Sequence, residues 1–264
     1  MTVPALPRRR ARLLRYGGWQ ARDYLINVAV ISIGLFGLMG TLEIMQLGAM
    51  EAMAMGNRAF VANLGRMRAQ SFMHVFAIYA TVGPIVALSG IIANDRAMGY
   101  VRFLFAKPLN PLLFYLQSFL VRLAGYFAVA GVLLAAYGYF DPVGDLERVA
   151  VGLLLGFVAY GGVLFLASAL TKYDGLVTVA FLLLATLAWG KWETATGVRR
   201  FIPYLFPPVG KFSDVNNWVA NLNPFDPRAP AVFPGKWVAW TVCYGVACLL
   251  LGLVALRKRA LVKA

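Results

Sequence analysis

Charged residues are scarce in this chain of 264 residues, and that scarcity excludes an ordinary soluble domain. Asp, Glu, Lys and Arg make up 14% of the sequence, whereas 61% is hydrophobic and the mean hydropathy is +0.71. Soluble domains are about half apolar and about one quarter charged. Charge-free runs of about 16 to 26 residues recur along the chain, and a helix needs about 20 apolar residues to cross a bilayer. The sequence therefore predicts an all-α, polytopic membrane protein.

The residue types that build metal, redox and hydrolytic sites are also rare. Cys243 and Cys248 lie five residues apart in one apolar run and face different directions, so they cannot form a disulfide with each other. His74 is the only histidine, which excludes a haem held by two histidines of one chain. We interpret His74 as a hydrogen-bonded interfacial residue rather than a proton relay. No cluster of Cys, His and acidic residues predicts a metal site.

A phosphate-binding loop is missing as well. The three Gly-Lys pairs, at 190–191, 210–211 and 235–236, are followed by aromatic residues instead of Ser or Thr, and none has a glycine five residues earlier. Any ATP that drives this protein must therefore be hydrolysed by another chain. We expect the chain itself to be no enzyme and to hold no cofactor.

Six apolar segments are predicted to cross the membrane within one transmembrane domain, 1–264. A basic leader, 1–23, mixes six arginines with apolar residues, as an interfacial helix does. A loop at 191–236 holds seven of the 13 prolines and many aromatic residues, so we expect an external element at or dipping into the interface. The predicted spans cover about 24–43, 69–93, 115–140, 149–171, 175–190 and 237–256.

The net charge of +14 is explained by orientation in the membrane rather than by nucleic-acid binding. Six spans place both termini on one side, and that side carries 15 of the 25 Lys and Arg residues but only three of the 11 acidic residues. Cationic loops face the cytoplasm and anionic lipid. Both termini are therefore predicted to be cytoplasmic. The lipid bilayer is the predicted partner, because its anionic headgroups attract the excess positive charge.

The loop between the second and third spans, 94–114, has a pattern of its own. Met98, Val101 and Phe105 recur at helical spacing, and Pro108 ends the pattern. This pattern predicts a short amphipathic helix on the cytoplasmic face. The simpler alternative is a positively charged loop that only obeys the topology rules.

This loop resembles the one that the ABC type-2 permease family places between its second and third spans. The likeness is carried by an acidic–basic pair at the end of the second span, a glycine, apolar residues, Lys-Pro, and Phe114–Tyr115 opening the third span. Leu109, Asn110 and Pro111 stand where that family often has Ser-Arg. Chain length, six spans, a basic leader and a Pro/aromatic loop before the last span agree with the family in layout.

The resemblance implies a permease subunit of an ATP-driven exporter. Such a subunit would form a homodimer or a heterodimer and bind two copies of a separate ATPase, which would carry ATP and Mg. The loop's short helix would be the coupling helix that contacts the ATPase. The residues implied in that contact are Asn94, Asp95, Arg96, Gly99, Arg102, Lys107 and Pro108.

Two charges and two groups of glycines inside the spans are further candidates. We interpret Glu43 as an anchor at the outer boundary and Arg122 as one that reaches the inner boundary. Small residues allow helices to approach closely, within the subunit or across a dimer. The glycines with this spacing are Gly34, Gly37 and Gly40 on the first span and Gly152 and Gly156 on the fourth.

Two other functions stay open at this point. The chain could be a non-transporting integral scaffold of a larger membrane complex, or a membrane enzyme whose site lies in 191–236. The few polar residues in the spans favour a lipidic, amphipathic or peptide cargo over an ion.

Overall fold

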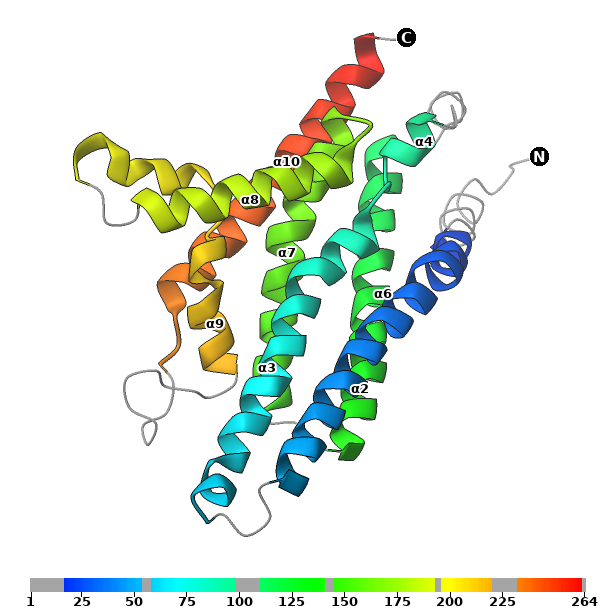
Figure 1. Ribbon diagram of the computed structural model, residues 1–264. Helices are drawn as coiled ribbons and strands as arrows, with labels where there is room; N and C mark the ends of the chain where they lie inside the picture. The colour runs from blue at the N-terminus through cyan, green and yellow to red at the C-terminus, as the bar shows by residue number, and fades with distance from the viewer. Residues whose placement is uncertain are drawn as a thin grey trace.

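The computed structural model describes residues 17–53, 58–97, 110–140, 145–192, 196–219 and 232–262, and within these ranges it is helical with no strand (Figure 1). The first helix runs without a break from residue 17 through a π-helical turn into α2. The elements are η1 (Leu25–Ala29), α2 (Val30–Met53), α3 (Arg58–Leu88), α4 (Ala93–Ala97), α6 (Pro111–Phe140), α7 (Leu146–Leu170), α8 (Asp174–Trp192), η2 (Gly197–Leu205), η3 (Val209–Lys211), α9 (Phe212–Val219) and α10 (Gly235–Val262).

Six of these helices, α2, α3, α6, α7, α8 and α10, are long and apolar enough to cross a membrane. This confirms the expected all-helical, multi-pass class. The helices extend past the predicted spans: α2 continues to Met53 and α3 already begins at Arg58, each about ten residues into the predicted loop. That segment is rich in Met and Ala, which favour helix whether or not they lie in lipid.

The core lies where α3, α6 and α7 meet. Tyr79 of α3 stacks on Tyr126 of α6 with ring centroids 4.8 Å apart, and Phe157 of α7 lies 5.2 Å from Tyr126. The Tyr79 hydroxyl donates to the Tyr126 carbonyl at 2.8 Å, so its polar atom is satisfied. By contrast, only 11% of the apolar window in α2 is buried. The α7 side of the bundle is therefore packed and the α2 side is open.

Glycines set the closest helix contacts. A Cβ on Gly156 would overlap the Ala80 carbonyl of α3, and one on Gly152 would lie 2.8 Å from Phe76. The predicted close packing of these two glycines is thus found within one chain. The same device joins α7 to α10, where Gly162 and Gly245 leave no room for a side chain against the partner backbone.

The predicted glycine stripe on the first span behaves differently. A Cβ on Gly34 or Gly40 would meet nothing within 4 Å, and one on Gly37 would meet only the Leu133 side chain at 3.9 Å. These three glycines therefore hold no close helix contact within the described part of the chain, and the alternative of a dimer contact stays a prediction.

Helix α8 runs across the end of α7 instead of alongside it (Figure 1). Its length and composition suit a membrane span. After α8, however, the chain returns along the bundle through η2, η3 and α9. The Trp189 indole at the end of α8 donates to the Pro207 carbonyl at 2.9 Å, and Phe212 of α9 packs 5.2 Å from Tyr160 of α7. The described part of the predicted external loop therefore folds back onto the bundle.

Apart from α8, the long helices run between two ends of the molecule (Figure 1). The start of the first helix, α4 and the end of α10 lie at one end, which we call the α4 end. The end of α2, the start of α7 and the end of α9 lie toward the other, the α9 end.

Candidate functional site at the α3–α4 junction

The candidate site is the turn that joins α3 to α4 and leads into the predicted coupling loop. Asn94 and Asp95 lie in α4, and so does Arg96, whose side chain is outside the described structure. Four predicted contact residues, Gly99, Arg102, Lys107 and Pro108, lie outside the described residues, between 97 and 110. The structure therefore shows how the loop is attached to the bundle.

The turn itself requires glycine. Gly90 has a φ of +72°, the left-handed region in which a Cβ is disfavoured, and a Cβ there would also clash with the Asn94 side chain. The Ser89 amide donates to Ile85 at 2.9 Å and closes α3, while the Asn94 amide donates to Gly90 at 3.2 Å and opens α4. A glycine in this conformation ends a helix and redirects the chain.

Two side chains from other helices accept hydrogen bonds from this turn. The Gly90 amide donates to the Asp174 carboxylate at 2.9 Å, and the Ile92 and Ala93 amides both donate to Ser168 Oγ at 3.1 Å. Ser168, at the end of α7, is fully buried and Asp174, at the start of α8, is 6% exposed. Buried backbone groups without such partners would be costly, so these contacts fix the turn.

Arg122 of α6 completes the junction on its other side. Its Nη1 donates to the Ala87 carbonyl at 2.7 Å and to the Ser89 carbonyl at 3.4 Å. These carbonyls are at the C-terminus of α3, where the helix dipole favours a cation. The Arg122 guanidinium therefore binds the C-terminus of α3, a partner that the interpretation as a boundary anchor did not include.

Acidic side chains surround the Arg122 charge. Asp23, Asp95 and Asp174 all lie within electrostatic range of the guanidinium. The charge of Asp95 in α4 therefore interacts with a cation of α6. A partly buried network of this kind is stabilising only when all its members are paired.

Together these contacts join the turn that leads into α4 to α6, α7 and α8. A displacement of α4 would move the turn, and the turn would then pull on Arg122, Ser168 and Asp174 or break its bonds to them. The arrangement suits the transmission of a mechanical displacement. No group of three or more His, Cys, Asp or Glu side chains that could hold a metal occurs among the described residues.

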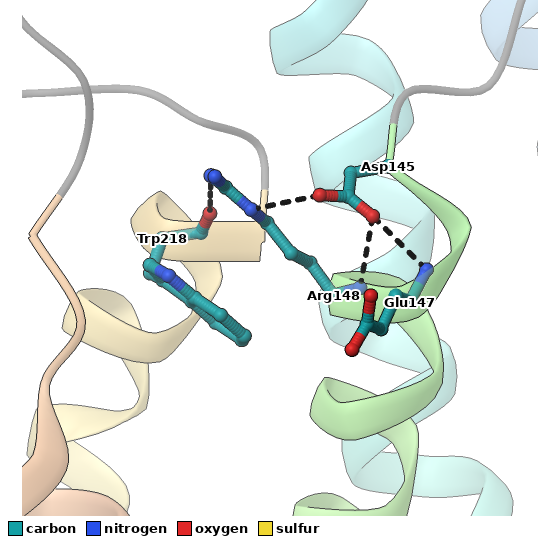
Figure 2. Close-up of polar contacts among 4 residues, drawn as sticks. All are labelled: Asp145, Glu147, Arg148 and Trp218. Atoms are coloured by element: carbon teal, nitrogen blue, oxygen red, sulfur yellow. Dashed lines mark hydrogen bonds and ion pairs between the residues drawn. The ribbon is translucent and has the colours of Figure 1, made fainter.

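A second polar cluster lies at the α9 end (Figure 2). Asp145 caps α7 by accepting from the Glu147 amide at 3.1 Å and the Arg148 amide at 3.4 Å, and its other oxygen pairs with Arg148 Nε at 3.0 Å. Arg148 also donates to the Trp218 carbonyl at 3.2 Å and lies 5.5 Å from the Trp218 ring centre. This clamp joins α7 to α9.

Glu43 and His74, which the sequence left apart, come together between α2 and α3. His74 Nδ1 lies 3.1 Å from Glu43 Oε1, and the Ser71 hydroxyl donates to Glu43 Oε2 at 2.8 Å. Both partners bind the carboxylate, and the His74 imidazole is 63% exposed. The arrangement is a side-chain bridge between two helices, in agreement with a hydrogen-bonded role for His74.

Sequence reasoning missed Gly90, Ser168 and Asp174. A weak signal existed, because a serine in an apolar helix and an acid at a helix start both need a partner.

Comparisons of the chain with protein-family models, with curated proteins and with solved structures found no significant match.

Proposed function

We propose that this chain is the membrane-spanning permease subunit of an ATP-binding-cassette transporter that exports its substrate. The observation that carries the proposal is the α3–α4 junction: the turn that leads into α4 and the predicted coupling loop is bonded to side chains of α6, α7 and α8. A loop that is pushed by a partner needs such an attachment, since a displacement travels into the bundle through hydrogen-bonded and packed contacts. The six membrane-length helices support the same proposal.

In this proposal the protein lies in the cytoplasmic (inner) membrane. Its α4 end faces the cytoplasm. The start of the first helix and the end of α10 lie at that end (Figure 1), next to the basic leader and the basic tail in sequence. Two copies of a soluble ATPase would bind there with ATP and Mg. The permease would act as a homodimer or with a similar chain.

Affinity purification from native membranes in mild detergent, followed by mass spectrometry, tests this proposal. We expect a soluble protein bearing G-x-x-x-x-G-K-[ST] in a fixed ratio to the tagged chain. Recovery of other membrane proteins in fixed ratio without any ATPase would instead identify a non-transporting scaffold.

A paired variant tests the contact surface. Gly99→Glu with Arg102→Glu should abolish co-purification of the ATPase and leave membrane insertion intact, because a bulky acidic surface replaces a small and a basic residue. Val198→Glu with Arg199→Glu, at exposed positions of η2, is the matched control and should retain the ATPase. Normal recovery with the first pair would reject the coupling assignment.

A further inference from the structure

A cavity lies between α2, α3 and α6, on the open side of the bundle. Its volume is about 120 Å³, similar to apolar cavities that stay dry and admit a small apolar molecule. Its walls are aliphatic and aromatic side chains together with two glycines of α2; among them are Phe36, Gly37, Gly40, Phe72, Leu133 and Tyr137.

Among the described residues, no charged side chain lines this cavity, and two of the wall hydroxyls are engaged by the protein. The Thr41 hydroxyl donates to the Gly37 carbonyl, and the Tyr79 hydroxyl donates to the Tyr126 carbonyl at 2.8 Å. The walls therefore suit an apolar ligand better than a charged or strongly polar one.

The glycines determine the shape of the cavity. A Cβ on Gly40 would meet nothing within 4 Å, and one on Gly37 would meet only the Leu133 side chain at 3.9 Å. A larger residue at either position would thus fill space without displacing the backbone. The empty volume exists because α2 has no side chain there.

The cavity opens toward the surrounding membrane. Thr41 of α2 and Ala136 of α6 line it and are also exposed. Leu38 and Leu42 of α2, beside the glycines, are 61% and 51% exposed. In a chain whose α2 is an apolar helix of membrane length, these exposed leucines face hydrocarbon. The molecules present at the mouth are therefore lipid chains.

We propose that this cavity binds the terminal segment of a lipid acyl chain, inserted between α2 and α6 from the bilayer. The end of the acyl chain fills the space beside Gly37 and Gly40 and contacts Phe72 and Tyr137 on the opposite walls. Dispersion contacts with the aromatic walls and burial of the chain end stabilise the bound state. The proposal depends only on the cavity and on membrane embedding, and it is independent of the permease assignment.

The test is photolabelling of the full-length chain in lipid nanodiscs that contain a phosphatidylcholine with a diazirine at the end of one acyl chain. Peptide mapping should show labelling enriched at 72–79 and 130–137 relative to the exposed faces of α8 and α10. Gly40→Phe fills the cavity from α2 and Ala136→Phe fills it from α6. Each should lower labelling of the opposite walls several-fold.

Gly34→Phe is the matched control, because Gly34 lies on the same helix, has nothing within 4 Å and does not line the cavity. It should leave the labelling pattern unchanged. A thermal melt of each variant verifies that it is folded. Equal labelling of all lipid-exposed helices in the wild type, or undiminished labelling at 72–79 and 130–137 in both folded filling variants, would overturn the proposal.

Discussion

The two ends of this molecule hold their helices together by the same kinds of bond in opposite environments. At the α4 end, Ser168 and Asp174 are buried and bond backbone amides 75 to 84 residues away in sequence. At the α9 end, the Asp145 and Arg148 side chains are 48% and 27% exposed, and Asp145 caps its own helix. Buried polar bonds are costly to leave half-made, whereas exposed ones are replaced by water. The helix contacts at the α4 end are therefore expected to open rarely, so that this end is a fixed joint. The contacts at the α9 end are expected to open more easily, so that this end is a loose one.

Loss of Arg122 at the α4 end should lower the stability of the protein more than any other substitution proposed here. Arg122→Met should lower the free energy of unfolding by about 3 kcal/mol, because it leaves carbonyls of α3 and three nearby acids without their cation. Chemical denaturation of the purified protein in detergent measures this change.

Arg148→Met is the matched control at the α9 end. Its effect should be below about 1 kcal/mol, because the ion pair with Asp145 is exposed. Equal losses for the two variants would contradict the distinction between a fixed and a loose end.

Gly156→Val should cost about 2 kcal/mol, since its side chain would overlap the Ala80 carbonyl and push α7 away from α3. The same substitution at Gly131 of α6, where nothing lies within 4 Å, should be close to neutral. Thermal melts of both variants measure the contrast. A neutral Gly156→Val would mean that α3 and α7 are less closely packed than described.

Ser168→Ala removes the acceptor of two buried amides, Ile92 and Ala93. The expected loss is about 1–2 kcal/mol, read as a lower midpoint of denaturation. Ser213→Ala, at an exposed serine that bonds Gly210 within its own turn, should change the midpoint little. If Ser213→Ala lowered the midpoint as much as Ser168→Ala, burial of the hydrogen bond would not explain the effect at Ser168.

The smallest expected effect is at Asp145. Asp145→Ala should cost about 1 kcal/mol through loss of the helix cap, whereas Asp145→Asn keeps a capping oxygen and should cost only a few tenths of a kcal/mol. If Asn proved as damaging as Ala, the ion pair with Arg148 would matter more than the cap.

The class of the fold could be predicted from apolar length, because hydropathy decides whether a helix is stable in lipid regardless of its neighbours. The path of α8 could not, since an apolar helix has no sequence signal for the angle at which it crosses α7. Gly162 and Gly245 show the same limit: a small residue predicts a close approach, but its partner lies 83 residues away in the chain.

The junction was predicted in part. The polar stretch from Asn94 indicated where the second span ends, and the structure places the end of α3 close by, at Leu88. The bonds that hold it could not be predicted from spacing, because Asp174 and Ser168 reach Gly90 and Ile92 across separate helices. Arg122 was assigned to the membrane boundary because hydropathy ranks charges by depth and does not detect unsatisfied carbonyls.

Amide hydrogen exchange of the intact protein in lipid nanodiscs tests the central claim, that the α3–α4 junction is a fixed joint, most directly. The amides of Gly90, Ile92 and Ala93 should exchange at least about tenfold more slowly than those of Glu147 and Arg148, because buried bonds open only with larger structural units. Equal exchange at the two ends would contradict the claim and leave α4 unable to carry motion into the bundle.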